Sequence, residues 1–358
     1  MIFTPKAGDN LLQMAKTGLG PLMIDVEGIM LTRADRSRLE HPLVGGVVLF
    51  SRNFNDRLQL ANLVSQIKAT RTPELLVATD HEGGRVQRFR NGFTRLPAAR
   101  VIGELFDEDS GRAKDLARTL GRVTGAELRD AGIDINFAPV LDLFRPSSKA
   151  IGDRSFHDDP VIVTTLGSQL LLGMWETGVH GVGKHFPGHG GVSEDSHHCL
   201  PVDERSLDAM RESDLAPYRL IERDALKGVM TCHVVFPQVD SLPATFSSRW
   251  IKDQLRGTLD FDGVVFSDDL VMTGAQTIGA PPARALQAID AGCDMVLVCN
   301  DSDAVDAILA ADSIPFDKNR AQRLEKLYGV LGVLSPVAQD LKSWAAALGA
   351  VATPSSAS

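Results

Sequence analysis

The chain contains little cysteine and no cysteine pair of the kind that marks a redox or zinc motif. Its 358 residues include four cysteines, Cys199, Cys232, Cys293 and Cys299, and no two of them form a C-x-x-C pair. Disulfide-stabilised extracellular domains are much denser in cysteine. The sequence therefore excludes a disulfide framework, and we expect a reduced, cytoplasmic protein.

Basic clusters and long apolar runs are also missing. Lys and Arg number 37 against 46 Asp and Glu, giving a formal net charge of −9, so we expect no nucleic-acid partner. No apolar run approaches the roughly 18 residues of a membrane helix. The N-terminal residues MIFTPKAGDNLLQ lack the basic and apolar regions of a secretory signal. We therefore expect no membrane association.

What the sequence does contain is a series of short apolar runs rich in Val, Ile and Leu. Most of these runs are continuous rather than alternating, which is typical of parallel strands covered on both faces. Between them lie stretches with helical spacing of apolar residues, at 56–70, 111–131, 161–177, 206–225 and 284–291. The eight predicted strands are residues 22–26, 46–50, 75–79, 133–138, 178–184, 228–234, 263–267 and 295–299.

Eight strand–helix units predict a single-domain α/β protein with a (β/α)8 TIM-type barrel. Polar side chains gather directly after the predicted strands, as they do on the catalytic side of such barrels, although polar residues can mark any strand end. We assign residues 1–349 to the barrel, including a helical region at 318–349 that packs outside it. Residues 350–358 have the small, polar composition of a flexible tail.

The loop after the fifth predicted strand holds four of the nine histidines, between His185 and His198. Its glycines and proline indicate a long loop rather than a helix or strand. Asp195 lies two residues before His197, so its carboxylate can accept a hydrogen bond from one imidazole nitrogen and leave the other free to exchange a proton. This arrangement suits general acid/base catalysis.

Two other interpretations of this loop stay open. Histidine and aspartate are also zinc ligands, but the spacing of His185, His189 and His197 matches no known zinc motif, and the glycines are incompatible with a zinc-binding helix. The simpler alternative is a solvated loop whose histidines only make hydrogen bonds.

Three further segments carry polar side chains suited to a sugar. In FSDDL (266–270), two adjacent carboxylates on an extended backbone point in opposite directions, so one can face the barrel mouth as a nucleophile. Both could instead cap the next helix. DHEGGRVQR (80–88) lacks the pattern of a phosphate loop, whereas its carboxylate and guanidinium groups suit a vicinal diol. GDRSF (152–156) supplies another candidate donor.

Together these segments resemble glycoside hydrolase family 3, in the branch of bacterial single-domain β-N-acetylhexosaminidases. The resemblance extends over residues 20–300, and its most specific part is the combination of the two motifs in the histidine-rich loop. One departure is His81, where the family pattern has Gln. The collinear motifs are KHFPGHG (184–190), DSHHCLP (195–201), DHEGGRVQR (80–88), GDRSF (152–156) and FSDDL (266–270).

The resemblance implies roles for individual residues. Asp268 would be the catalytic nucleophile, His197 the acid/base and Asp195 its orienting partner. No metal or other cofactor is implied. The residues that would hold the hydroxyls of N-acetylglucosamine are Asp80, Arg88, Arg154, Lys184 and His185.

The resemblance also implies a function: a monomeric, retaining exo-β-N-acetylglucosaminidase that acts on a small carbohydrate. In this branch the substrates are typically anhydro-muropeptides from peptidoglycan recycling. Three alternatives remain at this point. The chain could be a β-N-acetylglucosaminide phosphorylase, a metal-dependent barrel hydrolase, or a sugar-binding barrel without activity.

Overall fold

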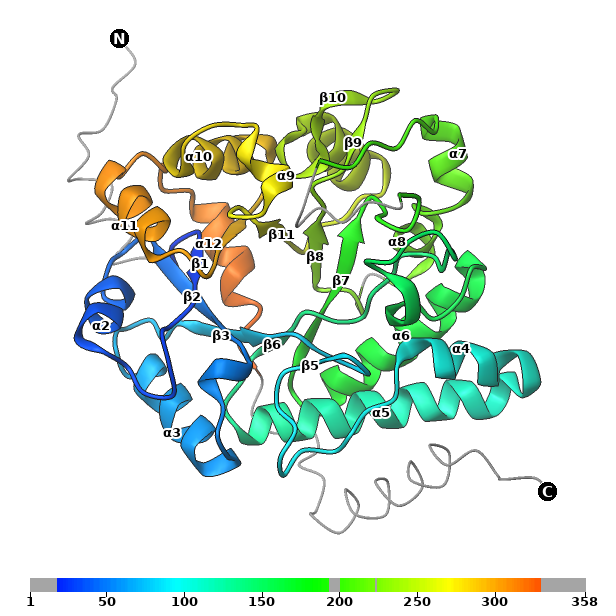
Figure 1. Ribbon diagram of the computed structural model, residues 1–358, viewed down its shortest axis with the longest axis horizontal. Coiled ribbons are helices and arrows are strands. Elements are labelled where there is room, and N and C mark those ends of the chain that lie inside the picture. The colour runs from blue at the N-terminus through cyan, green and yellow to red at the C-terminus, as the bar shows by residue number, and fades with distance from the viewer. Residues whose placement is uncertain (1–17, 193–199, 223, 330–358) are drawn as a thin grey trace.

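The protein is built on a closed barrel of eight parallel strands (Figure 1). A computed structural model describes residues 18–192, 200–222 and 224–329. Successive barrel strands are neighbours in space, and the first pairs with the last. Each strand overlaps one of the predicted apolar runs, so the predicted single-domain (β/α)8 barrel is confirmed. The barrel strands are β1 (Leu22–Ile24), β2 (Val44–Leu49), β3 (Leu76–Thr79), β6 (Ile135–Asn136), β7 (His180–Phe186), β8 (Gly228–Thr231), β11 (Val264–Asp269) and β12 (Met295–Val298).

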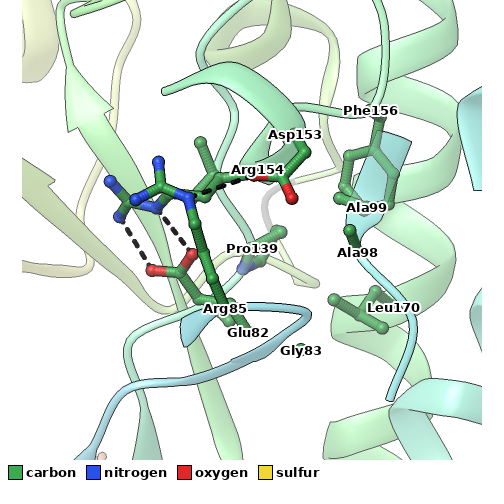
Figure 2. A pocket seen from close by; sticks show the side chains of 12 residues that line it. Glu82, Gly83, Arg85, Ala98, Ala99, Pro139, Asp153, Arg154, Phe156 and Leu170 are labelled. Atoms are coloured by element: carbon green, nitrogen blue, oxygen red, sulfur yellow. Dashed lines mark hydrogen bonds and ion pairs between the residues drawn. The ribbon is translucent and has the colours of Figure 1, made fainter. Parts of the chain in front are cut away.

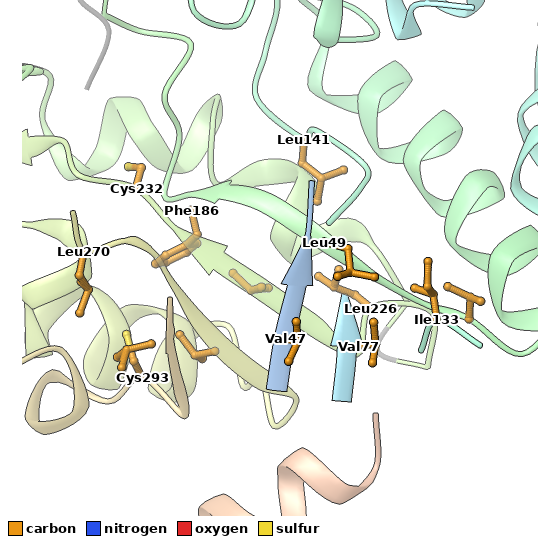
Figure 3. Packing of buried hydrophobic residues seen from close by; sticks show 14 of the residues in the cluster. Val47, Leu49, Val77, Ile133, Leu141, Phe186, Leu226, Cys232, Leu270 and Cys293 are labelled. Atoms are coloured by element: carbon orange, nitrogen blue, oxygen red, sulfur yellow. The ribbon is translucent and has the colours of Figure 1, made fainter. Parts of the chain in front are cut away.

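The apolar runs are continuous because both faces of the barrel wall are buried. In β2, Val47 and Leu49 belong to an outer cluster between strands and helices, whereas Val48 belongs to an inner cluster that fills the barrel. In β3, Val77 faces outward in the same way and Ala78 faces inward. Figure 3 shows side chains of the outer cluster, from Val47 and Val77 across to Phe186 of β7 and Leu270, which directly follows β11. This two-sided burial stabilises the barrel by removing apolar side chains on both faces of its wall from water.

Helices surround the barrel, and several of them begin at a residue whose side chain caps the first turn. Asp56 accepts a hydrogen bond from the N–H of Gln59 at the start of α3, and Asp109 accepts one from Arg112 at the start of α5. The helices α5 and α6 pack along each other at one side of the molecule (Figure 1). The outer helices are α2 (Arg33–Leu39), α3 (Arg57–Lys68), α4 (Ala99–Glu108), α5 (Ser110–Asp130), α6 (Pro160–Glu176), α10 (Pro281–Ala291), α11 (Ser302–Ala311) and α12 (Lys318–Glu325).

The single helix predicted over 206–225 was wrong. The structure has two short helices there, α7 (Leu207–Glu212) and α8 (Ala216–Leu220). Ser213 ends α7 with a non-helical backbone, and Pro217 lies in the first turn of α8. Because proline has no N–H to donate to the preceding turn, a continuous helix could not pass through this position without losing a hydrogen bond.

The loops after the barrel strands contain small elements of their own. Two hairpins lie there, β4 (His81–Gly83) with β5 (Val86–Gln87) after β3, and β9 (Val235–Phe236) with β10 (Asp240–Pro243) after β8. These elements surround the carboxyl ends of the strands. The remaining elements are η1 (Ser51–Asn53), η2 (Gly152–Arg154), η3 (Ala244–Phe246), the π-helix η4 (Arg249–Thr258) and α9 (Thr273–Gln276).

The predicted C-terminal helical region, the predicted tail and the four cysteines lie only partly within the described residues. Of the predicted region 318–349, residues 318–325 form α12, and residues from 330 onward lie outside the described part, as does the predicted tail at 350–358. Cys232, Cys293 and Cys299 are buried and free, and Cys199 lies outside the described residues. None of the described helices has the length and apolarity needed to span a membrane.

Candidate active site

A cavity of about 450 Å³ opens at the carboxyl ends of the barrel strands. Its walls come from β2, β3, β7, β8, β11 and β12 and from the segments that follow them. In a TIM-type barrel this end carries the catalytic groups. Two predicted residues, Asp195 and His197, lie outside the described residues. The other six all line the cavity: Asp80, Arg88, Arg154, Lys184, His185 and Asp268.

The centre of the charged wall is the ammonium of Lys184. This side chain is only 3% exposed, and its Nζ lies 2.8 Å from Oδ1 of Asp80 and 2.7 Å from Oε1 of Glu82. A desolvated ammonium is stable only when it is paired in this way. Lys184 comes from β7, whereas both carboxylates come from the segment after β3. The barrel therefore brings together groups about a hundred positions apart in the sequence.

Two arginines extend this network in opposite directions. Arg88 donates from Nη2 to Oδ2 of Asp80 at 2.9 Å. Arg154 donates from Nε and Nη2 to the two oxygens of Glu82, both at 2.8 Å, which is the bidentate geometry of a strong arginine–carboxylate pair. Lys184 thus joins an Arg88–Asp80 pair to a Glu82–Arg154 pair.

Burial raises the pKa of Asp80 and of Glu82, but the surrounding cations more than offset it. Lys184 and Arg88 hold the pKa of Asp80 well below its ordinary value. Arg154 and Lys184 lower the pKa of Glu82 to about 2. Both carboxylates are therefore ionised near neutral pH, and they present acceptors beside fixed donors. This combination can bind the hydroxyl groups of a sugar.

Glu82 was not among the predicted site residues, although it pairs with both Lys184 and Arg154. In the sequence Glu82 follows the third predicted strand, and only its position within DHEGGRVQR indicated that it could belong to the site. Figure 2 shows the Glu82–Arg154 pair next to the Arg85–Asp153 pair, at a small cavity of about 20 Å³ whose opposite side is apolar. Arg154 belongs to η2, and the adjoining apolar side chains include Phe156 and Leu170.

His185 is oriented by a carboxylate from another strand end. Its Nδ1 lies 2.6 Å from Oδ2 of the fully buried Asp142, so Nδ1 donates to this carboxylate. The other oxygen of Asp142 accepts the main-chain N–H of His189 at 2.6 Å. Burial raises the pKa of Asp142, yet His185 leaves that pKa below its ordinary value. The sequence placed Asp142 after the fourth strand but did not reveal this pairing.

Asp268 and Asp269 end β11, and both line the cavity. The main-chain N–H of Asp269 donates to Oδ1 of Asp268 at 2.8 Å. Oδ1 of Asp269 accepts from the N–H groups of Val271 and Cys299 at 3.1 and 3.2 Å. Asp269 is thus tied to the main chain, whereas Asp268 is the carboxylate with a candidate catalytic role.

The cavity wall also has an apolar part. It includes Phe50, Phe137, Met230, Met272 and Leu297. The charged network and the apolar wall give the cavity two chemically different sides, as a sugar with both hydroxyl groups and C–H faces requires. Within the described residues, no group of three His, Cys, Asp or Glu could hold a metal ion. His197 and Asp195 are outside that part, so the metal interpretation of their loop is untested.

Comparison with known proteins identifies the family. A model of the glycosyl hydrolase family 3 N-terminal domain matches residues 12–324. The chain belongs to this family. The family 3 enzyme is 51% identical over 310 residues to a protein of Chromobacterium violaceum named Beta-hexosaminidase, with 87% of each chain covered. It is 52% identical over 309 residues to a protein of the same name from Bordetella avium, covering 86% of this chain and 88% of the relative.

Solved structures agree with this assignment. NagZ of Neisseria gonorrhoeae in complex with N-trifluoroacetyl-D-glucosamine is 44% identical, with a TM-score of 0.88 over 94% of this chain and 99% of that one. The same protein in complex with a zinc ion is 43% identical, with a TM-score of 0.87 and the same coverage. The predicted family and enzyme class, a glycoside hydrolase of the β-hexosaminidase branch, are therefore confirmed.

Proposed function

We propose that the family 3 enzyme is a retaining exo-β-N-acetylglucosaminidase that removes a terminal β-linked N-acetylglucosamine. The observation that carries this proposal is the placement of Asp268 in the same cavity as the network of Asp80, Glu82 and Lys184. A carboxylate can react at the anomeric carbon while the network holds the hydroxyls of the same sugar. The names of the curated relatives and the glucosamine derivative bound to the gonococcal protein support this choice of sugar.

In the proposed first step, a carboxylate oxygen of Asp268 attacks the anomeric carbon. The bond from that carbon to the leaving oxygen breaks through an oxocarbenium-like transition state, and His197 donates a proton to the leaving oxygen. A glycosyl ester of Asp268 and a free alcohol result. Asp195 keeps His197 in the tautomer that makes this transfer possible.

In the second step, His197 takes a proton from water as the water oxygen bonds to the anomeric carbon. The ester bond to Asp268 breaks, the carboxylate is restored and the product keeps the β configuration. The ordinary pKa of histidine, about 6.5, suits both directions of proton transfer near neutral pH. Asp80, Arg88, Arg154, Lys184 and His185 bind the hydroxyls, with Glu82 holding Lys184 and Arg154 in place.

The proposal extends to the biological setting. We propose a monomeric, cytoplasmic enzyme whose substrates are anhydro-muropeptides released during peptidoglycan recycling. This part rests on the motifs shared with the β-hexosaminidase branch of the family. The proposed reaction requires neither a metal nor another cofactor.

The direct test compares the 4-nitrophenyl β-glycosides of N-acetylglucosamine, N-acetylgalactosamine and glucose. We expect the N-acetylglucosamine substrate to have the highest kcat/KM and the first product to have the β configuration. Release of a sugar 1-phosphate in phosphate buffer would instead identify a phosphorylase. Binding of N-acetylglucosamine without turnover of any glycoside would identify a sugar-binding protein.

A further inference from the structure

Four charged residues form an ion-pair network next to both ends of the segment that carries the proposed acid/base. Arg205 lies at its centre, and its guanidinium pairs with the carboxylates of Asp203 and Asp214. Arg145 also pairs with Asp214. None of the four lines the catalytic cavity, and the proposed mechanism gives them no role. We call Arg145, Asp203, Arg205 and Asp214 the loop-base network.

The network holds Arg205 through directed hydrogen bonds. Its Nε and Nη2 donate to the two oxygens of Asp203 at 2.9 and 2.6 Å, and its Nη1 donates to Oδ2 of Asp214 at 2.6 Å. The side chains of Asp203 and Asp214 are only 3% and 0% exposed. Burial opposes the charge of Arg205, but its bonds to both carboxylates leave its pKa above the ordinary value. The guanidinium therefore stays charged and fixed.

The chain that enters the histidine-rich loop lies directly on this network. Gly188 has a φ of +146°, and a Cβ at this position would lie 2.5 Å from the Cβ of Asp214. A Cβ at Gly191 would overlap both Nη2 of Arg205 and Oδ2 of Asp203. Approach this close requires residues without a side chain. The main chain at 188–191 is thus packed against the charged groups themselves.

The chain that leaves the loop is fixed at the same place, because Asp203 and Arg205 belong to it. The N–H of Asp203 donates to the carbonyl of Val235 at 2.8 Å, and the N–H of Val235 donates to the carbonyl of Pro201 at 3.0 Å. Val235 belongs to β9, in the hairpin after β8. The entering chain at Gly191 therefore contacts residues of the leaving chain that are themselves attached to the barrel.

The entering chain is also joined to the catalytic cavity. The N–H of His189 donates to Asp142, and the same carboxylate holds His185 in the cavity wall. Both ends of the segment 193–199 thus have fixed positions relative to the bound sugar. His197 lies in this segment, outside the described residues. Because fixed ends limit where the middle of a chain segment can lie, the loop-base network limits the positions open to His197.

We propose that Arg205 is a positioning residue for proton transfer by His197 and acts by joining the two ends of the loop. The inference rests on the proposed function, in which His197 is the acid/base. A misplacement of a reacting group by about 1 Å can cost about 10²-fold in rate. Loss of the Arg205 charge should therefore weaken proton transfer and leave sugar binding intact, since the sugar-binding wall is built from other residues.

The test changes Arg205 and the leaving group together. For Arg205→Gln we expect kcat/KM to fall by about 10- to 100-fold with a disaccharide, whose leaving oxygen needs a proton, and by less than about threefold with a nitrophenyl glycoside. The inhibition constant of N-acetylglucosamine should change by less than about twofold. Arg205→Lys keeps the charge without the planar fork and should give an intermediate loss. An unchanged ratio of the two kcat/KM values in Arg205→Gln would overturn the inference.

The matched control is Arg323→Gln. Arg323 belongs to α12 and pairs with Asp294, which directly precedes β12 and whose side chain is 2% exposed. Asp294 also binds a second arginine, Arg256, as Asp214 does in the loop-base network. The side chains of Arg323 and Arg205 are 29% and 27% exposed. Arg323→Gln should lower the unfolding midpoint but keep the wild-type ratio of the two kcat/KM values. A ratio shifted as in Arg205→Gln would assign the effect to stability and overturn the inference.

A double variant separates this inference from the proposed function. In a His197→Ala enzyme, Arg205→Gln should cause no further loss with the disaccharide, because the proton donor through which Arg205 acts is gone. The same fold loss in both backgrounds would overturn the inference. If His197→Ala lowers kcat/KM equally for both substrates, the proposed role of His197 fails; a leaving-group-dependent loss in His197→Ala but not in Arg205→Gln overturns only this inference. Asp203→Asn weakens the same pair and replaces Arg205→Gln if that variant does not fold.

Discussion

The main-chain N–H of Asp269 donates to Oδ1 of Asp268 at 2.8 Å, so one carboxylate residue helps to position its neighbour. The side chain of Asp269 is held in turn by the N–H groups of Val271 and Cys299. Burial, with smaller contributions from the charges of Asp268 and Asp25, raises the pKa of Asp269 to about 7. Below about pH 7 the cavity therefore avoids two adjacent negative charges.

The raised pKa of Asp269 makes stability dependent on pH. Between about pH 4 and pH 7 the unfolded chain ionises this carboxyl while the folded enzyme keeps its proton, so its contribution to folding falls as pH rises. Asp269→Asn removes the dependence and keeps an oxygen for the two N–H donors. We expect the variant to gain about 2–4 kcal/mol over the wild type between pH 4 and pH 8.

Denaturant unfolding of the two proteins at several pH values measures this difference. Measurements near pH 4 serve as the internal reference, because Asp269 is then neutral in the folded enzyme and the ionisation effect is small. A stability difference that stays constant from pH 4 to pH 8 would contradict the protonated state of Asp269.

The proposed nucleophile can be identified chemically. A fluorinated N-acetylglucosamine derivative that forms a slowly hydrolysed intermediate should label the enzyme with one sugar per chain. Peptide mapping should place the label on Asp268, within residues 264–270. A label on any other carboxylate, or a product of inverted configuration, would reject Asp268 as the nucleophile.

The role of His197 can be separated from that of Asp268 by changing the leaving group. His197→Ala removes a proton donor, which is typically worth about 10²–10⁴ in rate. We expect this loss with a disaccharide, whose leaving oxygen needs a proton, and a smaller loss in the glycosylation step with a nitrophenyl glycoside. Asp268→Ala should abolish turnover of both substrates, because neither can form the ester.

The measurement is kcat/KM of each variant on both substrates. Asp195→Ala should give the same pattern as His197→Ala with a smaller loss, since it only misorients the imidazole. Equal losses on both substrates for His197→Ala would assign His197 to sugar binding. His189 and Glu194 would then be the next candidates for the acid/base.

Glu82 is predicted to be essential for the geometry of the sugar-binding wall. Glu82→Gln removes the charge that pairs with both Arg154 and Lys184, and loss of one partner from a buried ion pair costs about 3–5 kcal/mol. We expect a lower unfolding midpoint and a fall in kcat/KM of at least about tenfold, equivalent to about 1.4 kcal/mol. Glu104→Gln, which changes an exposed pair with Arg100, is the control and should leave both quantities nearly unchanged.

Metal independence is the remaining prediction. The proposed mechanism needs no Lewis acid, so exhaustive EDTA treatment should leave kcat and KM unchanged. Activity and metal content should be measured on the same dialysed sample. Stoichiometric zinc together with loss of activity on its removal would support the metal-dependent alternative.

The barrel was predictable because its signal is local and repeated. Continuous apolar runs such as those containing Val47 and Val77 reflect burial on both faces, and this burial is the same at every strand. The helix predicted over 206–225 does not form as one element, because Pro217 lacks the N–H that a continuous helix needs at this position and lies instead in the first turn of a second short helix.

The sequence by itself determined the family motifs, the barrel and the residues proposed to react with or bind a sugar, since all of these depend on local residue types and their order. Only the tertiary structure decided which charges pair. Lys184 binds both Asp80 and Glu82, and His185 binds Asp142, because the closed barrel brings the ends of separate strands to one cavity. Such pairings depend on distances across the barrel, and residues far apart in the chain carry no local signal of them.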